Sequence, residues 1–203
     1  MRALSYLGFR KLRFVHAGVW YTWPTPDLLT LSSLTGNRGT PQEHAPPWDL
    51  LVGSLMKNAP PSYECPFCRI AETLPSPTPE AAVVLVDADV FALVPTHHYA
   101  GIKGNCLVLP RGHYENVLDI PDNLGSEFFR ATRRLAHAMR NAFRCEGIST
   151  RQHNGPAGDQ DVWHFHLHVF PRYSNDGLHA GQKVPYTNEE RIELAASLRV
   201  ALR

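Results

Sequence analysis

The 203-residue sequence has no long apolar run and no marked excess of charge. No uninterrupted apolar stretch approaches the roughly 20 residues that a membrane-spanning helix needs, so the sequence predicts no membrane partner. The net charge of +1 gives no reason to expect a nucleic-acid partner. Apolar residues make up 43% of the chain and charged residues 19%, which is the composition of a globular protein with a sizeable core.

Cysteine is also scarce, with four residues in the chain. Cys65 and Cys68 form a Cys-x-x-Cys pair, whereas Cys106 and Cys145 stand alone. This distribution is not typical of the disulfide framework of a small secreted protein. We therefore expect a reducing compartment, and a cytoplasmic location.

Acidic residues are absent from the first 26 residues, which include arginines and a lysine. Prolines interrupt residues 1–61, and no sustained period of 2 or 3.6 is present there, so we expect a disordered N-terminal extension. An arginine-rich, acid-poor start is also typical of a transit peptide. A flexible tail and a start codon placed too far upstream, with Met56 as the later start, are the other interpretations.

Residues 62–203 have the pattern of one α+β domain. Short β-branched runs bounded by turn residues predict strands, and a 3.6-residue apolar period predicts helices. Pro110 and Pro171 are expected to end two of the strands, and Gly147 to follow the long helix in the left-handed conformation. The predicted strands cover residues 83–86, 90–94, 106–109, 148–152 and 163–170, and the predicted helices cover 123–143 and 189–202.

Three histidines alternate with apolar residues near the end of the domain. Because side chains alternate between the two faces of a strand, His164, His166 and His168 would share one face, and the apolar residues of 163–169 would face the core. A neutral imidazole can attack phosphorus and form a covalent phosphoramidate. Aligned imidazoles can also bind a metal, or lie on a surface with no role at all.

A glycine-containing loop precedes the histidines directly. Gly155 and Gly158 would let the backbone approach a ligand closely and turn N–H groups toward an anion. An ordinary turn has the same composition, so only the position of the loop directly before the three histidines suggests a role in binding.

These segments together resemble the histidine-triad (HIT) superfamily. The signature of that family is His-x-His-x-His with apolar residues at each x, as in residues 164–168. Pro110-Arg111-Gly112-His113 resembles the family's earlier Pro-basic-x-His turn, and Gly158 and Gln160 also match. The resemblance extends over residues 62–203 with the motifs in the family's order.

The resemblance implies a five-stranded antiparallel sheet with one long helix and a C-terminal helix, and commonly a homodimer. It implies a nucleotide hydrolase or nucleotidyl transferase that acts at the α-phosphate through a nucleotidyl-histidine intermediate. His166 would be the nucleophile and His168 would bind the phosphate oxygens. The alternative is a nucleotide-binding HIT-like module with little turnover. The other positions expected to bind the substrate are Asn105, Asn154, Gly158 and Gln160.

The Cys-x-x-Cys pair predicts a zinc site. In the branch of the family that opens with such a pair, the remaining ligands correspond to His113 and His164. Thiolates and imidazoles in tetrahedral geometry select zinc, and four protein ligands make Cys65, Cys68 and their two partners a closed, structural site. The alternatives are a chance pair of cysteines and a zinc-dependent hydrolase in which the triad holds a catalytic metal.

Several positions depart from the family pattern. The acidic residue that often ends the second strand is missing, and His97 and His98 stand nearby, either lining the pocket or exposed in a loop. His153 replaces a frequent asparagine, and Asp159 and Asp161 replace small residues. A carboxylate near a phosphate repels it unless the carboxylate is paired, so the two aspartates put the usual substrate preference in doubt. Asp161 and the missing acidic residue of the second strand motivate the binding-module alternative.

Overall fold

A computed structural model of the chain describes residues 11–16, 19–24, 57–178 and 181–203. The chain divides into two units, Met1–Ala45 and Pro46–Arg203. No helix within the described ranges is long and apolar enough to cross a bilayer.

The smaller unit contains an antiparallel hairpin of β1 (Lys11–His16) and β2 (Val19–Pro24). We expected residues 1–61 to be mostly disordered, and this hairpin is a regular element within that range. The valine, tryptophans, tyrosine and threonine of β2 are strong β formers, so local propensity explains the strand without a clear alternation. The rest of the predicted extension up to Met56 lies outside the described residues, and the boundary at residue 62 stays a prediction.

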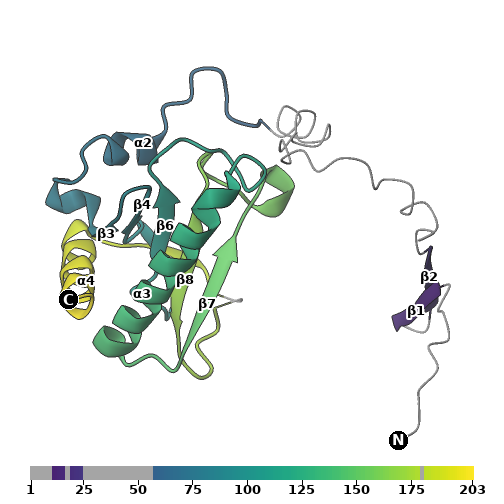
Figure 1. Cartoon of the computed structure of the whole chain (residues 1–203). Helices are drawn as coiled ribbons and strands as arrows, with labels where there is room; N and C mark the ends of the chain where they lie inside the picture. Colours follow the sequence, from purple (N-terminus) through teal and green to yellow (C-terminus); the bar gives the residue numbers. More distant parts are fainter. Residues whose placement is uncertain (1–10, 17–18, 25–56, 179–180) are drawn as a thin grey trace, which may run out of the picture. The chain divides into compact units, whose positions relative to one another are not determined.

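The larger unit is built on a five-stranded antiparallel sheet in the order β3-β4-β6-β8-β7 (Figure 1). Two longer helices accompany the sheet, and α3 packs along one of its faces. The predicted α+β fold is therefore confirmed. The strands are β3 (Val83–Val86), β4 (Val90–Leu93), β6 (Cys106–Pro110), β7 (Gly147–Gln152) and β8 (Leu167–Arg172), and the helices are α2 (Pro66–Ala71), α3 (Gly125–Phe143) and α4 (Asn188–Ala201).

Both faces of β4 and β6 are buried, which explains why these two strands are apolar at every position. Ala92 and Val108 face the core that α3 and α4 complete. Phe91 and Leu109 alternate with them and join a second apolar cluster that includes residues of the α2 segment. The face that receives α2 is the face on which the candidate site lies.

The ends of the helices differ slightly from the prediction. The long helix begins at Gly125, preceded by a 3₁₀ turn at Asp122–Leu124. Arg144, not Gly147, adopts the left-handed conformation that ends α3, with φ of 53°, and Gly147 instead begins β7. A capping box of Thr187 and Glu190 starts α4.

The strand predicted over residues 163–170 begins later and ends later. β8 runs from Leu167 to Arg172, so His164 and His166 lie just before the strand. Pro110 is the last residue of β6, as expected, whereas Pro171 lies inside β8, one residue before the end of that strand. The ladder between β6 and β8 extends to Val108 on β6 and to Val169 on β8, so neither proline takes part in it.

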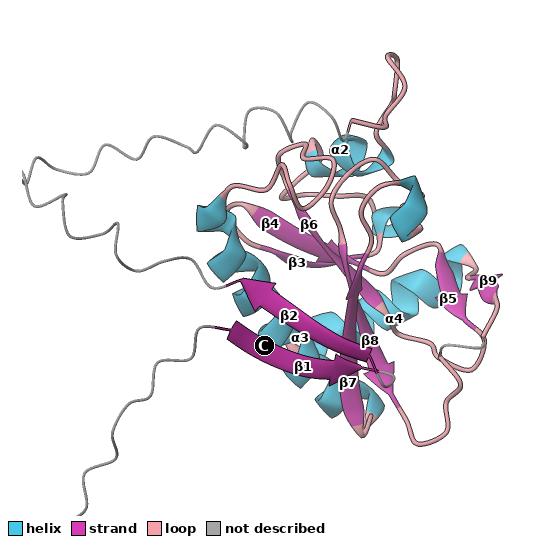
Figure 2. Ribbon diagram, turned by 90° about the vertical axis from the view of Figure 1, so that its right-hand side faces the viewer, coloured by secondary structure: helices cyan, strands magenta, loops and turns pink. Residues whose placement is uncertain are grey.

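A second, two-stranded sheet pairs β5 (His97–Tyr99) with β9 (Lys183–Pro185), two elements that the sequence did not predict (Figure 2). His97 and His98 therefore lie in a strand and not in a loop. His97 is exposed, whereas His98 is buried against the ring of Tyr186. Lys183 pairs with Tyr99 in this sheet, which brings a C-terminal segment beside the candidate site.

Candidate active site and metal centre

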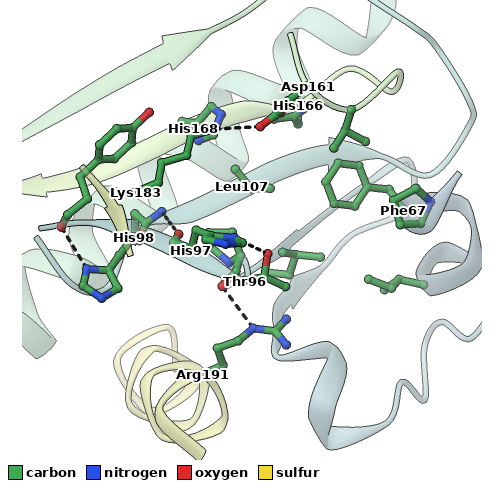
Figure 3. A pocket seen from close by; sticks show the side chains of 17 residues that line it. Phe67, Thr96, His97, His98, Leu107, Asp161, His166, His168, Lys183 and Arg191 are labelled. Atoms are coloured by element: carbon green, nitrogen blue, oxygen red, sulfur yellow. Dashed lines mark hydrogen bonds and ion pairs between the residues drawn. The ribbon is translucent and has the colours of Figure 1, made fainter. Parts of the chain in front are cut away.

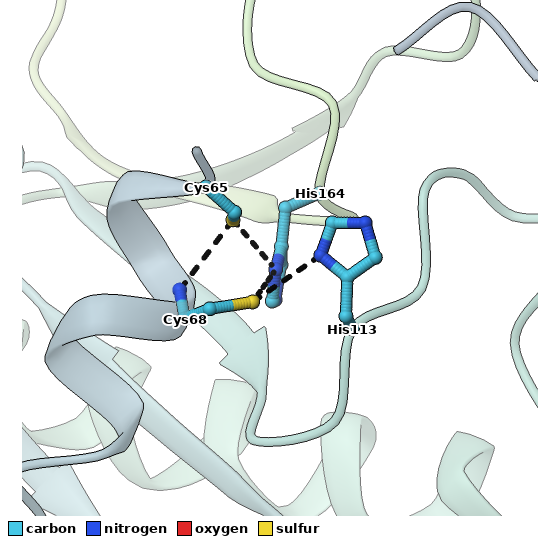
Figure 4. Close-up of side chains that lie close together, drawn as sticks. All are labelled: Cys65, Cys68, His113 and His164. Carbon is cyan, nitrogen blue, oxygen red and sulfur yellow. Dashed lines mark hydrogen bonds between the residues drawn. The ribbon is translucent and has the colours of Figure 1, made fainter. Parts of the chain in front are cut away.

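Cys65, Cys68, His113 and His164 form a compact group in which all four ligand atoms lie within 4.8 Å of one another (Figure 4). The Sγ of Cys65 lies 3.3 Å from Nδ1 of His164, and the Sγ of Cys68 lies 3.2 Å from Nδ1 of His113. Cys65 caps the N-terminus of α2, which holds both sulfurs on one side of that helix. The structure thus brings together the four residues that the sequence predicts as metal ligands.

The hydrogen bonds of His164 prepare its ring to be a ligand. Its Nε2 lies 3.1 Å from the carbonyl oxygen of Pro110, which can only accept, so Nε2 carries the proton and Nδ1 faces the cysteines with its lone pair. The side chain is fully buried, and burial lowers its pKa to about 4 against the opposing effect of the Pro110 carbonyl. The imidazole is therefore neutral, as a metal ligand must be.

The spacing fits a tetrahedral zinc ion. With Zn–S of about 2.3 Å and Zn–N of about 2.0–2.1 Å, a tetrahedral ion separates sulfur from nitrogen by about 3.5 Å. The observed sulfur–nitrogen distances are 3.2, 3.3 and 3.6 Å. Burial and the adjacent Cys65 raise the pKa of Cys68 to about 12, so two neighbouring thiolates require a cation between them. The donor set therefore suits zinc.

A cavity of about 240 Å³ opens beside this group (Figure 3). One part of its wall is apolar and comes from α2 and the central strands, with Phe67, Ile70 and Leu107 among its residues. The other part is polar and includes His166 and His168. Phe67 joins the metal group to the cavity, because its ring centroid lies 5.6 Å from those of both His164 and His166.

His166 is held in a single tautomer. Its Nδ1 lies 2.8 Å from the carbonyl oxygen of His164, so Nδ1–H donates and Nε2 keeps a lone pair. Nε2 has no hydrogen-bond partner among the described residues. The side chain is 3% exposed, and burial lowers its pKa more than the carbonyl and Asp161 raise it. The ring is therefore a neutral imidazole with one free nitrogen.

His168 lies next to His166, with the ring centroids 5.0 Å apart. Its ring stacks on Phe170, and its Nδ1 is buried without a hydrogen-bond partner among the described residues. Burial and the His166 ring lower its pKa to about 3. A buried nitrogen without a partner calls for a group that the protein itself does not supply.

The alternation predicted for the histidine segment holds for most of its residues. Phe165 packs edge-on against Phe128 of α3, with the ring centroids 5.0 Å apart, and Val169 is buried in the same core. Trp163 was predicted to be buried, but it is half-exposed and lies outside that core. The three histidines therefore share the face toward α2 even though two of them precede β8.

The glycine loop is organised around Gln160. Its Oε1 accepts a hydrogen bond from the N–H of Gly155, and its Nε2 donates to the carbonyl of Glu115. The N–H groups of Gly158 and Gln160 donate to the carbonyl of Gly155, so the loop uses the N–H groups that we expected to face an anion. Asn154 accepts a hydrogen bond from the N–H of Val117. Substrate contacts by Asn154, Gly158 and Gln160 stay predictions.

Asn105 lines the cavity, but its amide already has partners. Its Nδ2 donates to the carbonyl of His97, and its Oδ1 accepts from the hydroxyl of Tyr186. The hydroxyl of Tyr186 in turn accepts the N–H of Gly104 at 2.7 Å. This network holds the edge of the cavity, and a direct substrate contact by Asn105 stays a prediction.

Asp161 is not an unpaired carboxylate beside the triad. Its Oδ2 lies 2.8 Å from Nζ of Lys183, and both side chains line the cavity with His166 and His168 (Figure 3). Burial would raise the pKa of Asp161, but the hydrogen bond and charge of Lys183 outweigh it and lower the pKa. Sequence reasoning missed Lys183 because no motif surrounds it and only the pairing of β9 with β5 brings it here.

The comparisons agree with this geometry. The HIT domain family matches residues 77–175, a range that includes the triad and ends before Lys183. The solved structures that resemble the chain include a Zn-bound histidine triad family protein from Mycobacterium smegmatis, with a TM-score of 0.57, 28% identity and coverage of 68% of this chain and 93% of that one. The adenosine 5'-monophosphoramidase of Saccharomyces cerevisiae is 28% identical over 63% of this chain and 75% of the relative.

The Protein hit of Bacillus subtilis gives a stronger match. It is 34% identical over 139 residues, which cover 66% of this chain and 91% of the relative. The matched family range and this relative together show that the chain belongs to the HIT domain family.

Proposed function

We propose that the chain is a nucleotide hydrolase or nucleotidyl transferase that acts at the α-phosphate through His166. The observation that carries this proposal is the hydrogen bond from Nδ1 of His166 to the carbonyl of His164, which leaves the Nε2 lone pair free beside the cavity. A relative whose name describes a nucleotide hydrolase, the yeast adenosine 5'-monophosphoramidase, supports the same class of reaction.

In the first step, Nε2 of His166 attacks the α-phosphorus and the bond from phosphorus to the leaving group breaks. The leaving group departs with the bonding electrons and takes up a proton from solvent. The imidazole then carries positive charge, and the His164 carbonyl that accepts Nδ1–H stabilises this charge. In the second step, water or another acceptor attacks phosphorus and the P–N bond breaks. The attacking group releases its proton to solvent, and the imidazole returns in its neutral form.

The remaining parts of the cavity fit a nucleotide. The apolar wall that includes Phe67, Ile70 and Leu107 suits a base, since ligand pockets combine apolar walls with a few polar groups. The unpartnered Nδ1 of His168 needs a hydrogen-bonding group, and a phosphate oxygen or a bridging water supplies one.

The metal part of the proposal is a structural zinc ion held by Cys65, Cys68, His113 and His164. Its support is the tetrahedral spacing of the donor atoms, and a solved relative whose title describes bound zinc. When bound, the ion would balance the two thiolates and fix α2 beside the cavity. Within the described residues, His166 and His168 are not part of this group, which argues against a catalytic metal held by the triad. A homodimer and a cytoplasmic location belong to the same proposal.

The proposal is tested by intact-protein mass spectrometry after brief incubation with an adenosine phosphoramidate, a dinucleoside polyphosphate and their guanosine counterparts. We expect a transient nucleotidyl adduct on the wild type and none on His166→Ala, which should still bind nucleotide because it loses little of the pocket. His137→Ala is the matched control, since His137 is exposed on α3 outside the cavity. Equal turnover by His166→Ala would refute the mechanism. Binding without any adduct or product in the wild type would favour a binding module.

A further inference from the structure

The ion pair between Asp161 and Lys183 stands at a shared boundary of two cavities. Both residues line the cavity that contains His166 and the apolar wall of Phe67. Both also line a second, more polar cavity whose wall includes Asp159. His168 is common to the two cavities as well. A phosphate attacked by His166 would therefore share its cavity with the Lys183 ammonium group.

Lys183 is a cation that can change partners. The side chains of Lys183 and Asp161 are 54% and 58% exposed, and an ion pair this exposed is worth little against water. Among the described residues, the other cation lining the main cavity is Arg191, whose guanidinium donates to the carbonyls of Val94 and Pro95 and to others. An entering phosphate can therefore displace Asp161 from Lys183 more easily than it can recruit Arg191.

We propose, resting on the function proposed above, that Lys183 is a phosphate-binding residue of this chain and that Asp161 is the partner that its ammonium group gives up when a phosphate binds. The phosphate of the substrate takes the place of Asp161 as the partner of Lys183. Lys183 lies beyond the residues 77–175 that match the family, on the strand β9 that pairs with β5.

Removing the charge of either partner of this ion pair should change the affinity for a nucleoside monophosphate in opposite directions. Lys183→Met keeps the length of the side chain but removes the charge, so it should weaken binding of a nucleoside monophosphate by about tenfold. Asp161→Asn removes a negative charge near the phosphate and should tighten the same binding by roughly threefold. If the pair only held β9 in place, both variants would weaken binding.

Calorimetric titration of the full chain with AMP, GMP and the uncharged nucleosides provides the measurement. We expect Lys183→Met to weaken the binding of the monophosphates and to leave the binding of the nucleosides unchanged. Lys183→Arg should retain most of the wild-type affinity for the monophosphates. Lys103→Met is the matched control, because Lys103 is an exposed lysine paired with Glu190 outside the main cavity. Thermal melting of each variant shows that it is folded.

Three outcomes would overturn the proposal: unchanged monophosphate affinity in Lys183→Met, equal weakening of nucleosides and monophosphates, or weaker monophosphate binding in Asp161→Asn. None of these depends on turnover, because the titrations use reaction products. A chain that binds as predicted but forms no adduct at His166 would refute the proposed function and retain the role of Lys183.

Discussion

Loss of the zinc ligands should damage the nucleotide pocket as well as the stability of the fold. α2 has six residues, too few to persist as an isolated helix, and it carries Phe67 between the two cysteines. Cys65→Ser removes a thiolate, while serine remains a good N-cap, so the variant separates metal binding from helix capping. We expect the zinc content to fall from one ion per chain to nearly none, and the thermal midpoint to fall with it.

The size of the binding defect follows from the place of Phe67 in the wall of the cavity. Its ring lines the cavity and meets His164 and His166 edge-on at 5.6 Å, so its displacement would remove apolar area that a bound base would cover. If α2 leaves its position, a loss of about 1.4 kcal/mol corresponds to a tenfold rise in the dissociation constant for a nucleoside monophosphate. Metal analysis by mass spectrometry and calorimetric titration measure the two effects on the same samples.

Two control variants separate the loss of zinc from other effects of the substitution. Cys145→Ala removes a buried thiol from the core outside the metal group, so it should keep its zinc. Phe67→Ala should keep its zinc and still show the weaker nucleotide binding. Unchanged zinc content in Cys65→Ser would refute the metal assignment, and unchanged nucleotide affinity after zinc loss would refute the role of α2 as a wall of the pocket.

Two predictions concern buried polar networks. Tyr186→Phe leaves the N–H of Gly104 and the Oδ1 of Asn105 without their partner, so it should cost about 2 kcal/mol and lower the thermal midpoint by about 4–8 °C in calorimetry; an unchanged midpoint would contradict this. Hydrogen bonds from Arg172 and from backbone N–H groups hold the pKa of Asp176 well below its usual value. The ionised Asp176 therefore stabilises the folded state above the unfolded pKa of about 3.9, and this contribution is lost as the pH falls toward the pKa of the folded state. Asp176→Asn should therefore lower the midpoint at pH 7, and its difference from wild type should shrink below about pH 4; a constant difference down to pH 3 would be inconsistent with this linkage.

The sequence predicts the main sheet well because its strands carry a direct signal. The apolar runs of β4 and β6 are buried on both faces, so burial and β propensity point to the same element. The apolar face of α3 is equally explicit, with Phe128, Leu135 and Met139 buried as predicted. Element ends were less predictable, since Pro171 lies inside β8, beyond the last residue of that strand that pairs with β6.

The small sheet could not be predicted from the sequence for the opposite reason. β5 and β9 have three residues each, and His97, Tyr99 and Lys183 form no apolar period. Their pairing depends on the fold that brings residues 97–99 beside 183–185, which is a long-range contact with no local signal. Lys183 is therefore the part of the candidate site that only the structure reveals.

The three histidines show how a periodic pattern can place residues without assigning their roles. The alternation puts all three on the side of α2, yet each ring meets a different environment. The Pro110 carbonyl accepts a hydrogen bond from Nε2–H of His164 and turns Nδ1 toward two sulfurs. The His164 carbonyl accepts a hydrogen bond from Nδ1–H of His166 and leaves Nε2 toward the cavity. Both orienting groups are backbone carbonyls, which every residue type supplies. The division between ligand and nucleophile is thus set by the path of the chain, and the composition of the motif alone cannot specify it.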